Sequence, residues 1–349
     1  MKRMVEMEEN GVKRAVELVL VGTMIAGLLT GCGSGSTGTT GEKTKTQIWN
    51  VASIQTEDHP QTLAVEKFGE VFSELTEGRY QIEVYPNELL GPQRETLEQV
   101  QYGIIEMAVI GNPNISSFVD GFLSFEMPYL FDDEEHQKRF FEESDAVDPL
   151  FEETEQYNFK IATYFTAGTR NMYANKPITC LADLKSMKIR TAESDTYSKM
   201  MKCLGGAATP MSLGEVFTAI QSGVVDGAEN NEQSYLNSKH YEIAPYYSYT
   251  KHLIVPDFLV VNEKLYNNLS DEDKAAFDEA ARQATEYEYQ LWAEDTARCQ
   301  EELKDEGVTL VTDVDVDELR DACAPLHKEL CENKEVEKIY NAVKATSEN

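Results

Sequence analysis

One uninterrupted helical pattern, from Ser270 to Gly307, constrains the fold more than any other feature of this sequence. Ser270 and Asp273, three residues later, form a capping box of the kind that begins a helix. Apolar residues then recur at alternating spacings of three and four, as on one face of a helix. At 1.5 Å per residue such a helix spans roughly 50 Å. Because this length exceeds the width of one ordinary domain, we expect the helix to straddle two domains.

The sequence before this helix alternates between strand and helix patterns. His59-Pro60 is expected in the turn after a first strand, and apolar residues from Ala64 to Leu75 then follow at the spacing of a helix. Another is expected from Pro92, which suits the first turn of a helix, to Gly103. Strands are expected at residues 48–53, 80–84, 107–110 and 160–165. This order of strands and helices is the pattern of an α/β domain.

A second α/β unit is expected from about residue 168 onward. Residues 188–190 alternate in polarity, so Lys188 and Arg190 share one face of a strand. The signals that follow are a capping box at 212–215, a helix stop at Gly223 and a strand at 224–225.

The N-terminal segment has the pattern of an export signal. Lys13 and Arg14 precede a short apolar run at 18–29, and small residues lead to Cys32. This arrangement resembles the lipobox of bacterial lipoproteins, so we expect residues 1–31 to be removed and Cys32 to be acylated. An ordinary secretory signal that happens to contain a cysteine is the alternative. Residues 32–46, rich in Gly, Ser, Thr and Lys, are expected to form a flexible tether.

The charge of the chain excludes several classes of partner. The sequence has 31 basic and 62 acidic residues, a formal net charge of −31. A charge this negative disfavours nucleic acid and anionic lipid as partners. Neither the histidines nor the cysteines have the spacing of a metal site, so we expect no metal and no cofactor.

Two arginines, Arg170 and Arg190, are expected at strand ends in this acidic chain. A guanidinium offers a rigid fork of donors that matches a carboxylate bidentately. The net negative charge repels an anion at long range, but screening limits that effect to about 8 Å at physiological salt. We therefore predict a clamp for an organic anion. The alternatives are a surface position for Arg190 and a purely structural role for Arg170.

Five motifs, in order and spacing, resemble TRAP transporter solute-binding proteins of the DctP type. The resemblance covers essentially the whole chain after the tether. The motifs are Leu90-Gly91, residues 168–170, residues 183–190, residues 215–221 and residues 225–230. Ser186 and Phe217 depart from the family pattern, which more often has glycine and tyrosine there.

This resemblance implies an α/β, two-lobed fold like that of periplasmic binding proteins, with a cleft between the lobes and a long helix spanning both. Lobe I would comprise residues 47–167 and about 256–295, and lobe II residues 168–255 and about 296–349. The lobes of such proteins close on their ligand by a hinge motion.

The resemblance also implies ligand-binding residues. Arg190 would make the main bidentate contact with a ligand carboxylate, Asn230 would add a hydrogen bond, and Arg170 would assist. Asn230 also fits a turn-capping role. Positions that line the family's cleft, and vary with the ligand, are Arg94, His59, Asn112 and Leu213. Because His59, Arg94 and Asn112 suit hydroxyl groups, a sugar acid such as a uronate or aldonate is the expected ligand. A C4-dicarboxylate or another small keto or hydroxy acid is the alternative.

The implied role is transport. Such a protein delivers its ligand to a small and a large integral membrane subunit, and a lipobox fits a Gram-positive-type form tethered to the outer face of the cell membrane. An extracellular sensor domain is an alternative class. An enzyme acting on organic acids is another, but the sequence has no recognisable nucleophile–base pair or paired carboxylates. We therefore expect a binding protein rather than an enzyme.

Overall fold

The computed structural model describes residues 45–347, which belong to one compact unit. The expected signal peptide, Cys32 and nearly all of the expected tether lie outside these residues. None of the helices within 45–347 is long and apolar enough to cross a lipid bilayer.

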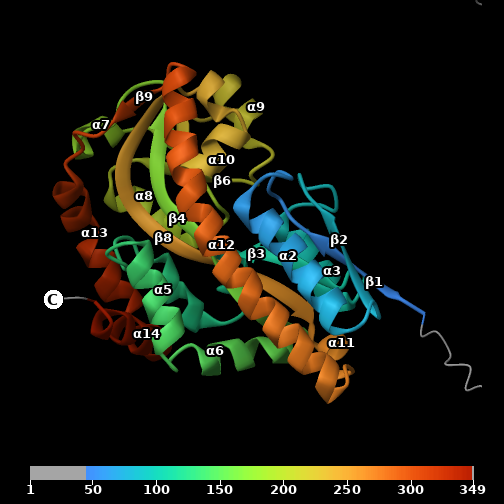
Figure 1. The fold of residues 1–349 in the computed structure, drawn as a ribbon. Helices are drawn as coiled ribbons and strands as arrows, with labels where there is room; N and C mark the ends of the chain where they lie inside the picture. Colours follow the sequence, from blue (N-terminus) through green and yellow to red (C-terminus); the bar gives the residue numbers. More distant parts are fainter. Residues whose placement is uncertain (1–44, 348–349) are drawn as a thin grey trace, which may run out of the picture. The chain divides into compact units, whose positions relative to one another are not determined.

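A nine-stranded mixed sheet forms the centre of this unit (Figure 1). Its strand order is β2-β1-β3-β8-β4-β7-β5-β6, and β9 pairs with β8 outside this path. The strands are β1 (Gln47–Ala52), β2 (Tyr80–Tyr85), β3 (Met107–Gly111), β4 (Phe159–Ala174), β5 (Lys188–Thr191), β6 (Ala207–Pro210), β7 (Gly227–Asn230), β8 (Tyr246–Asn262) and β9 (Thr309–Val311).

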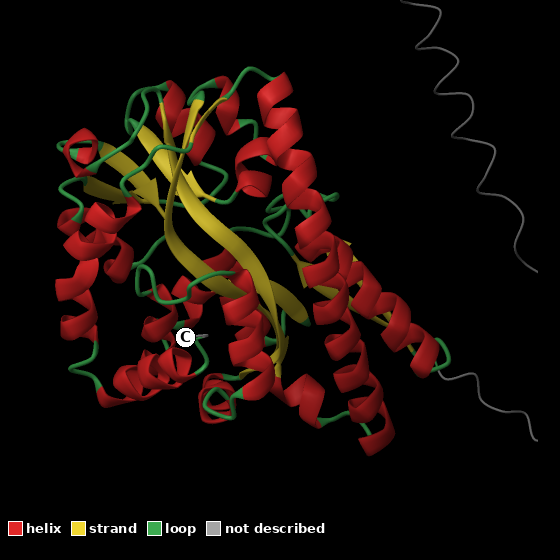
Figure 2. Cartoon of the chain, turned by 60° about the vertical axis from the view of Figure 1, so that its left-hand side comes forward, coloured by secondary structure: helices red, strands yellow, loops and turns green. Residues whose placement is uncertain are grey.

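Two long antiparallel strands, β4 and β8, connect the two halves of the sheet (the longest yellow strands in Figure 2). The parallel strands β1, β2 and β3 lie on one side of this pair, as the sheet of lobe I. The parallel strands β5, β6 and β7 lie on the other side, as the sheet of lobe II. Between Thr166 and Thr169 the register of β4 against β8 shifts. The expected α/β fold with two lobes is therefore confirmed.

The helices that accompany the sheet are mostly short. In chain order they are α2 (Pro60–Leu75), α3 (Gln93–Tyr102), α4 (Asn112–Ile115), η1 (Asp120–Glu126), α5 (Glu134–Glu143), α6 (Asp148–Glu153), η2 (Thr154–Tyr157), α7 (Leu181–Leu184), α8 (Asp195–Cys203), α9 (Val216–Gln221), α10 (Glu232–Asn237), η3 (His240–Glu242), α11 (Glu263–Asn267), α12 (Asp271–Asp305), α13 (Val316–Leu330) and α14 (Lys334–Ala345).

Helix α12 is the long helix that the sequence predicts, with 35 residues. The side chain of Ser270 accepts a hydrogen bond from the Asp273 amide at its start, and Gly307 follows its end with a φ of +80°. The helix packs against α2 of lobe I and against α10 of lobe II (Figure 1). It therefore spans both lobes.

Three apolar clusters stabilise the unit. Trp49, Phe72 and Phe277 belong to the cluster between the lobe I sheet and α12. Tyr173 and Tyr247 belong to a smaller cluster in lobe II. The third cluster includes residues of β3, β4 and β8 and of α13 and α14. Helix α13 packs on α8, whereas α14 packs on η1, so the C-terminal segment contacts both halves of the molecule.

Two local predictions in lobe II are corrected. The strand expected at 224–225 is a turn, because the amides of Val224 and Val225 both donate to the Ala219 carbonyl; the strand begins at Gly227. The capping box is only partly present. Glu215 accepts from both the amide and the hydroxyl of Ser212, and helix α9 begins only after Glu215.

Candidate functional site

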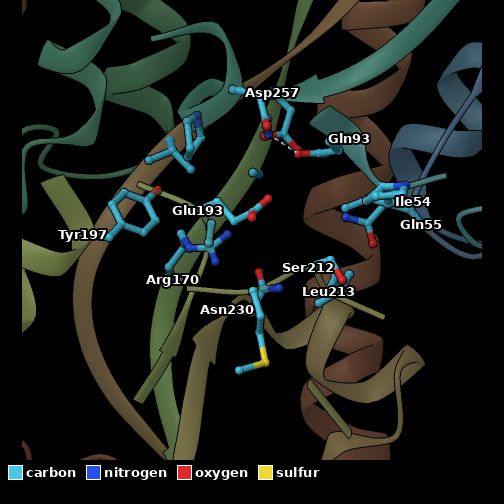
Figure 3. Close-up of a pocket in the computed structure, with 18 of the residues that line it drawn as sticks. Ile54, Gln55, Gln93, Arg170, Glu193, Tyr197, Ser212, Leu213, Asn230 and Asp257 are labelled. Carbon is cyan, nitrogen blue, oxygen red and sulfur yellow. Dashed lines mark hydrogen bonds between the residues drawn. The ribbon is translucent and has the colours of Figure 1, made fainter. Parts of the chain in front are cut away.

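A pocket lies between the lobes and receives side chains from both (Figure 3). Lobe I and the central strands contribute Ile54, Gln55, Glu88, Pro92, Gln93, Gly111, Pro113, Asn114, Ala167, Val255 and Asp257. The remaining lining residues are Arg170, on β4, and from lobe II Arg190, Ala192, Glu193, Tyr197, Met211, Ser212, Leu213, Asn230 and Asn231. Several of these follow the carboxyl ends of the parallel strands β1, β2, β5 and β7, where ligands of α/β proteins commonly bind.

Arg190, on β5, is a buried cation in the lining of the pocket. Its Nε and Nη2 donate to the Met211 carbonyl at 3.0 and 2.6 Å. Within residues 45–347 no carboxylate lies within 4.0 Å of this guanidinium, although only 4% of the residue is exposed. Burial lowers the pKa of Arg190 from its ordinary value. A buried guanidinium that faces a pocket and has no carboxylate close by favours an anionic ligand.

Arg170, on β4, is in a different state because Glu229 already neutralises it. Its Nε and Nη2 donate to the two carboxylate oxygens of Glu229 at 2.5 and 2.8 Å. Burial alone would lower the pKa of Arg170, but the Glu229 carboxylate raises it overall. Burial would likewise raise the pKa of Glu229, but the charge of Arg170 and the nearby His252 ring, whose Nε2 lies 3.6 Å from a carboxylate oxygen, lower it to about 2. Arg170 therefore brings little uncompensated charge to the pocket.

Asn230 and Leu213 also line the pocket. The side-chain oxygen of Asn230, at the end of β7, accepts from the Asn231 amide at 2.9 Å. The Asn230 NH2 group donates to no other group within residues 45–347, so it is available to a ligand. The side chain of Asn231 donates to the Ala167 carbonyl and caps α10, which fixes this corner. Leu213 adds an apolar surface (Figure 3).

Three predicted cleft residues, Arg94, Asn112 and His59, are not among the residues that line this pocket. Arg94 points to solvent, with 74% of its side chain exposed, and its neighbour Gln93 faces the pocket instead. Asn112 is buried and donates to the Phe122 carbonyl at 3.1 Å.

His59 is the third of these residues, and it is buried at the start of helix α2. Its Nδ1 accepts from the Gln61 amide at 3.2 Å, which caps helix α2, and its ring packs edge-on against Trp292. Burial lowers the pKa of His59 to about 3, so the ring is neutral near pH 7.

Sequence reasoning missed most of the polar lining of lobe I. Gln55 follows β1, Glu88 follows β2, and Asn114 follows β3 in the short helix α4. The side chain of Asn114 donates to the Gln93 side chain at 3.0 Å. The signal for them was available, since each follows the carboxyl end of a predicted parallel strand.

The missed residues also change the electrostatics of the pocket. Three carboxylates, those of Glu88, Glu193 and Asp257, line it together with the two arginines. Burial raises the pKa of Asp257, whereas a hydrogen bond from Gln61 and the charge of Arg170 lower it. Among residues 45–347, the pocket thus offers one cation without a carboxylate within 4.0 Å, Arg190, and many hydrogen-bond acceptors. Within the described part of the chain, no three His, Cys, Asp or Glu side chains are grouped to hold a metal ion.

Comparison with known proteins identifies the family. The family model for bacterial extracellular solute-binding proteins, family 7, matches residues 51–334. The chain belongs to this family, that of the TRAP solute-binding proteins. A solute-binding protein of Chromohalobacter salexigens is 32% identical over 305 residues, which cover 87% of this chain and 88% of the relative.

Solved structures of TRAP solute-binding proteins have the same fold. That of Anaerococcus prevotii, with bound D-glucuronate, has a TM-score of 0.84 and 36% identity, covering 86% of this chain and 98% of the other. That of Roseobacter denitrificans, with bound β-D-glucuronate, has a TM-score of 0.83 and 31% identity, covering 86% and 100%. TRAP solute-binding proteins serve transport.

Proposed function

We propose that this chain captures a sugar acid, most simply a uronate, through a salt bridge between the ligand carboxylate and Arg190. The observation that carries the proposal is the buried Arg190 guanidinium, which faces the pocket without a carboxylate partner among residues 45–347. A ligand carboxylate would accept its remaining N–H groups, and charge-assisted hydrogen bonds of this kind contribute about 1.5–3 kcal/mol each. Asn230 would donate a further hydrogen bond to this carboxylate, and Arg170 would assist from nearby.

The rest of the pocket favours a ligand rich in hydroxyl groups. Gln55, Gln93, Glu88 and Asp257 all present side-chain oxygens that can accept hydrogen bonds from hydroxyls. Two similar structures hold glucuronate, which combines one carboxylate with several hydroxyls. A C4-dicarboxylate has fewer donors for these acceptors and is the less favoured ligand.

A thermal-shift screen tests the ligand class. D-glucuronate, D-galacturonate, D-gluconate, succinate and pyruvate are added to the purified protein at equal concentration, with D-glucose as the uncharged control. Because a ligand that binds only the folded state raises the Tm, we expect increases with the sugar acids and none with D-glucose. An increase with succinate alone would contradict the proposal.

We infer the rest of the transport role from the family. The loaded protein would deliver its ligand to the small and large membrane subunits of a TRAP transporter. An acylated Cys32 would tether it to the outer face of the cell membrane through residues 33–46. The two lobes would close on the ligand by bending at residues 167–168 and 255–256, where the chain crosses between them. The register shift between Thr166 and Thr169 supports this position of the hinge.

A further inference from the structure

We propose that Glu88 determines specificity, by selecting ligands with one carboxylate over ligands with two, and that the same side chain holds the lobes together across the cleft. This inference deepens the proposed function and rests on it. Three observations support it: the backbone that presents Glu88, its contact with the opposite lobe, and the distribution of charge in the pocket.

The backbone around Glu88 has an uncommon conformation. Asn87 and Glu88 have φ values of 58° and 56°, two successive residues in the left-handed region. This region is unfavourable for a non-glycine residue, by roughly 1–2 kcal/mol. Main-chain hydrogen bonds from Asn87 to the Gln55 carbonyl, at 2.7 Å, and from Glu88 to the Ser53 carbonyl, at 3.2 Å, hold the turn against lobe I. The turn therefore presents the Glu88 carboxylate from a fixed position.

The Glu88 side chain reaches across the cleft to lobe II. Its Oε1 accepts a long hydrogen bond from the Gly214 amide at 3.4 Å. A Cβ atom at position 214 would lie 2.3 Å from Oε2 of the same carboxylate, so an alanine there would displace the Glu88 side chain from this position. Glu88 also lines the pocket, where its remaining lone pairs can accept hydrogen bonds from ligand hydroxyls.

The charges of the pocket explain the selection. Glu229 pairs with Arg170, whereas Arg190 has no carboxylate within 4.0 Å among residues 45–347, although the charges of Glu229 and Glu88 act on it from farther away. After a first ligand carboxylate pairs with Arg190, a second one finds no other unpaired cation in the lining formed by residues 45–347. It instead meets the Glu88 carboxylate, and like charges at short range in a partly buried pocket repel strongly. A hydroxyl at the same place donates to Glu88.

The test compares the wild-type protein with Glu88→Gln by calorimetric titration of D-glucuronate and D-glucarate, which has a second carboxylate. The variant keeps an oxygen that can accept from Gly214 but loses the negative charge. We expect the preference for D-glucuronate over D-glucarate to fall about tenfold or more, with D-glucarate binding more tightly to the variant than to the wild type. If D-glucarate binds the variant no better, Glu88 does not select against the second carboxylate.

A matched control removes a carboxylate elsewhere in lobe I. Glu66 is exposed on α2 and does not line the pocket, so Glu66→Gln should leave the preference unchanged. If it changes the preference as much as Glu88→Gln, the effect is one of net charge and the inference fails. Wild-type protein that binds no sugar acid would instead refute the proposed function itself.

A second variant tests the contact between the lobes. Gly214→Ala keeps the Glu88 charge but crowds its carboxylate. We expect weaker binding of D-glucuronate, by about threefold or more, with D-glucarate still disfavoured. Unchanged affinity for D-glucuronate would show that the contact does not contribute to the closed state.

Discussion

At the scale of single residues, the two arginines of the pocket differ in their partners. Arg170 forms a bidentate pair with Glu229, whereas the nearest bonded partner of Arg190 is the main-chain carbonyl of Met211. The same type of side chain therefore serves two purposes: one arginine is held in place by the protein, and the other is available to a ligand. We therefore expect removal of Arg170 to lower mainly the stability of the protein, and removal of Arg190 to lower mainly its affinity for the ligand.

Removing Arg170 should destabilise the protein. Arg170→Ala leaves the fully buried Glu229 carboxylate without its cation, and breaking a buried pair in this way costs about 3–5 kcal/mol in free energy of unfolding. Urea unfolding followed by circular dichroism measures this change. Arg190→Ala is the matched comparison, because it leaves no carboxylate unpaired and should cost clearly less. Equal losses for the two variants would contradict the distinction.

The buried His59 should make stability depend on pH. Its pKa is about 3 in the folded protein, below the value of 6.5 for an exposed histidine. The unfolded chain therefore binds a proton between pH 6.5 and 3 that the folded protein does not. This lowers the free energy of unfolding by up to about 1.4 kcal/mol per pH unit as the pH falls. Above pH 6.5 the contribution to the slope vanishes.

The variant His59→Asn tests this slope. Asparagine keeps an oxygen that can accept from the Gln61 amide but does not titrate, so the urea unfolding free energy should vary less steeply between pH 6 and 4. Poorer packing against Trp292 would lower the free energy of unfolding by the same amount at every pH, so it would not change the slope. An unchanged slope would show that His59 titrates normally in the folded protein.

The pocket residues were only partly predictable from sequence, for a physical reason. Arg190 and Asn230 lie at strand ends within lobe II, and short motifs around them determine their orientation. Among the lobe I residues, Gln93 and Asn114 lie on the helices α3 and α4, where only some side chains face the pocket. Gln93 faces the pocket and its neighbour Arg94 faces solvent, a difference of one position that spacing alone did not resolve.

At the scale of elements, the junction of β4 with α12 is the most constrained part of the fold. Gly168 lies at the register shift with a φ of +61°, and a Cβ atom there would lie 2.5 Å from the Trp292 ring of α12. Helix α12 therefore contacts the sheet closely where the two lobes meet. The sequence predicted α12 well because its capping and periodicity are local, whereas the turn at 224–225 depends on hydrogen bonds to Ala219.

Gly168→Ala should lower the stability of the protein more than a glycine-to-alanine substitution at a position with open space around it. It combines the unfavourable φ, worth about 1–2 kcal/mol, with a clash against Trp292, and overpacking adds typically 1–3 kcal/mol. Gly223→Ala is the control, since Gly223 has a φ of +73° but no atom near its would-be Cβ. Thermal unfolding should show a larger fall in Tm for Gly168→Ala. Equal falls would mean that the contact with Trp292 has no cost.

At the scale of the whole molecule, the expected lipid anchor determines where the protein acts. Cys32→Ala should move the protein from the membrane fraction to the soluble fraction of cells that express it, because the acylated residue is lost. Cys331→Ala, at the end of α13, is the control and should stay with the membrane. Immunoblots of the two fractions measure the change. A Cys32→Ala protein that remains membrane-bound would contradict acylation at this residue.

The central claim, that Arg190 anchors a ligand carboxylate between the lobes, is tested most directly by calorimetric titration of D-glucuronate against Arg190→Ala. The loss of the anchor should cost about 2–5 kcal/mol, a fall in affinity of roughly a hundredfold or more. Arg94→Ala removes an equal charge outside the pocket and should bind like the wild type. Wild-type affinity in Arg190→Ala would contradict the claim.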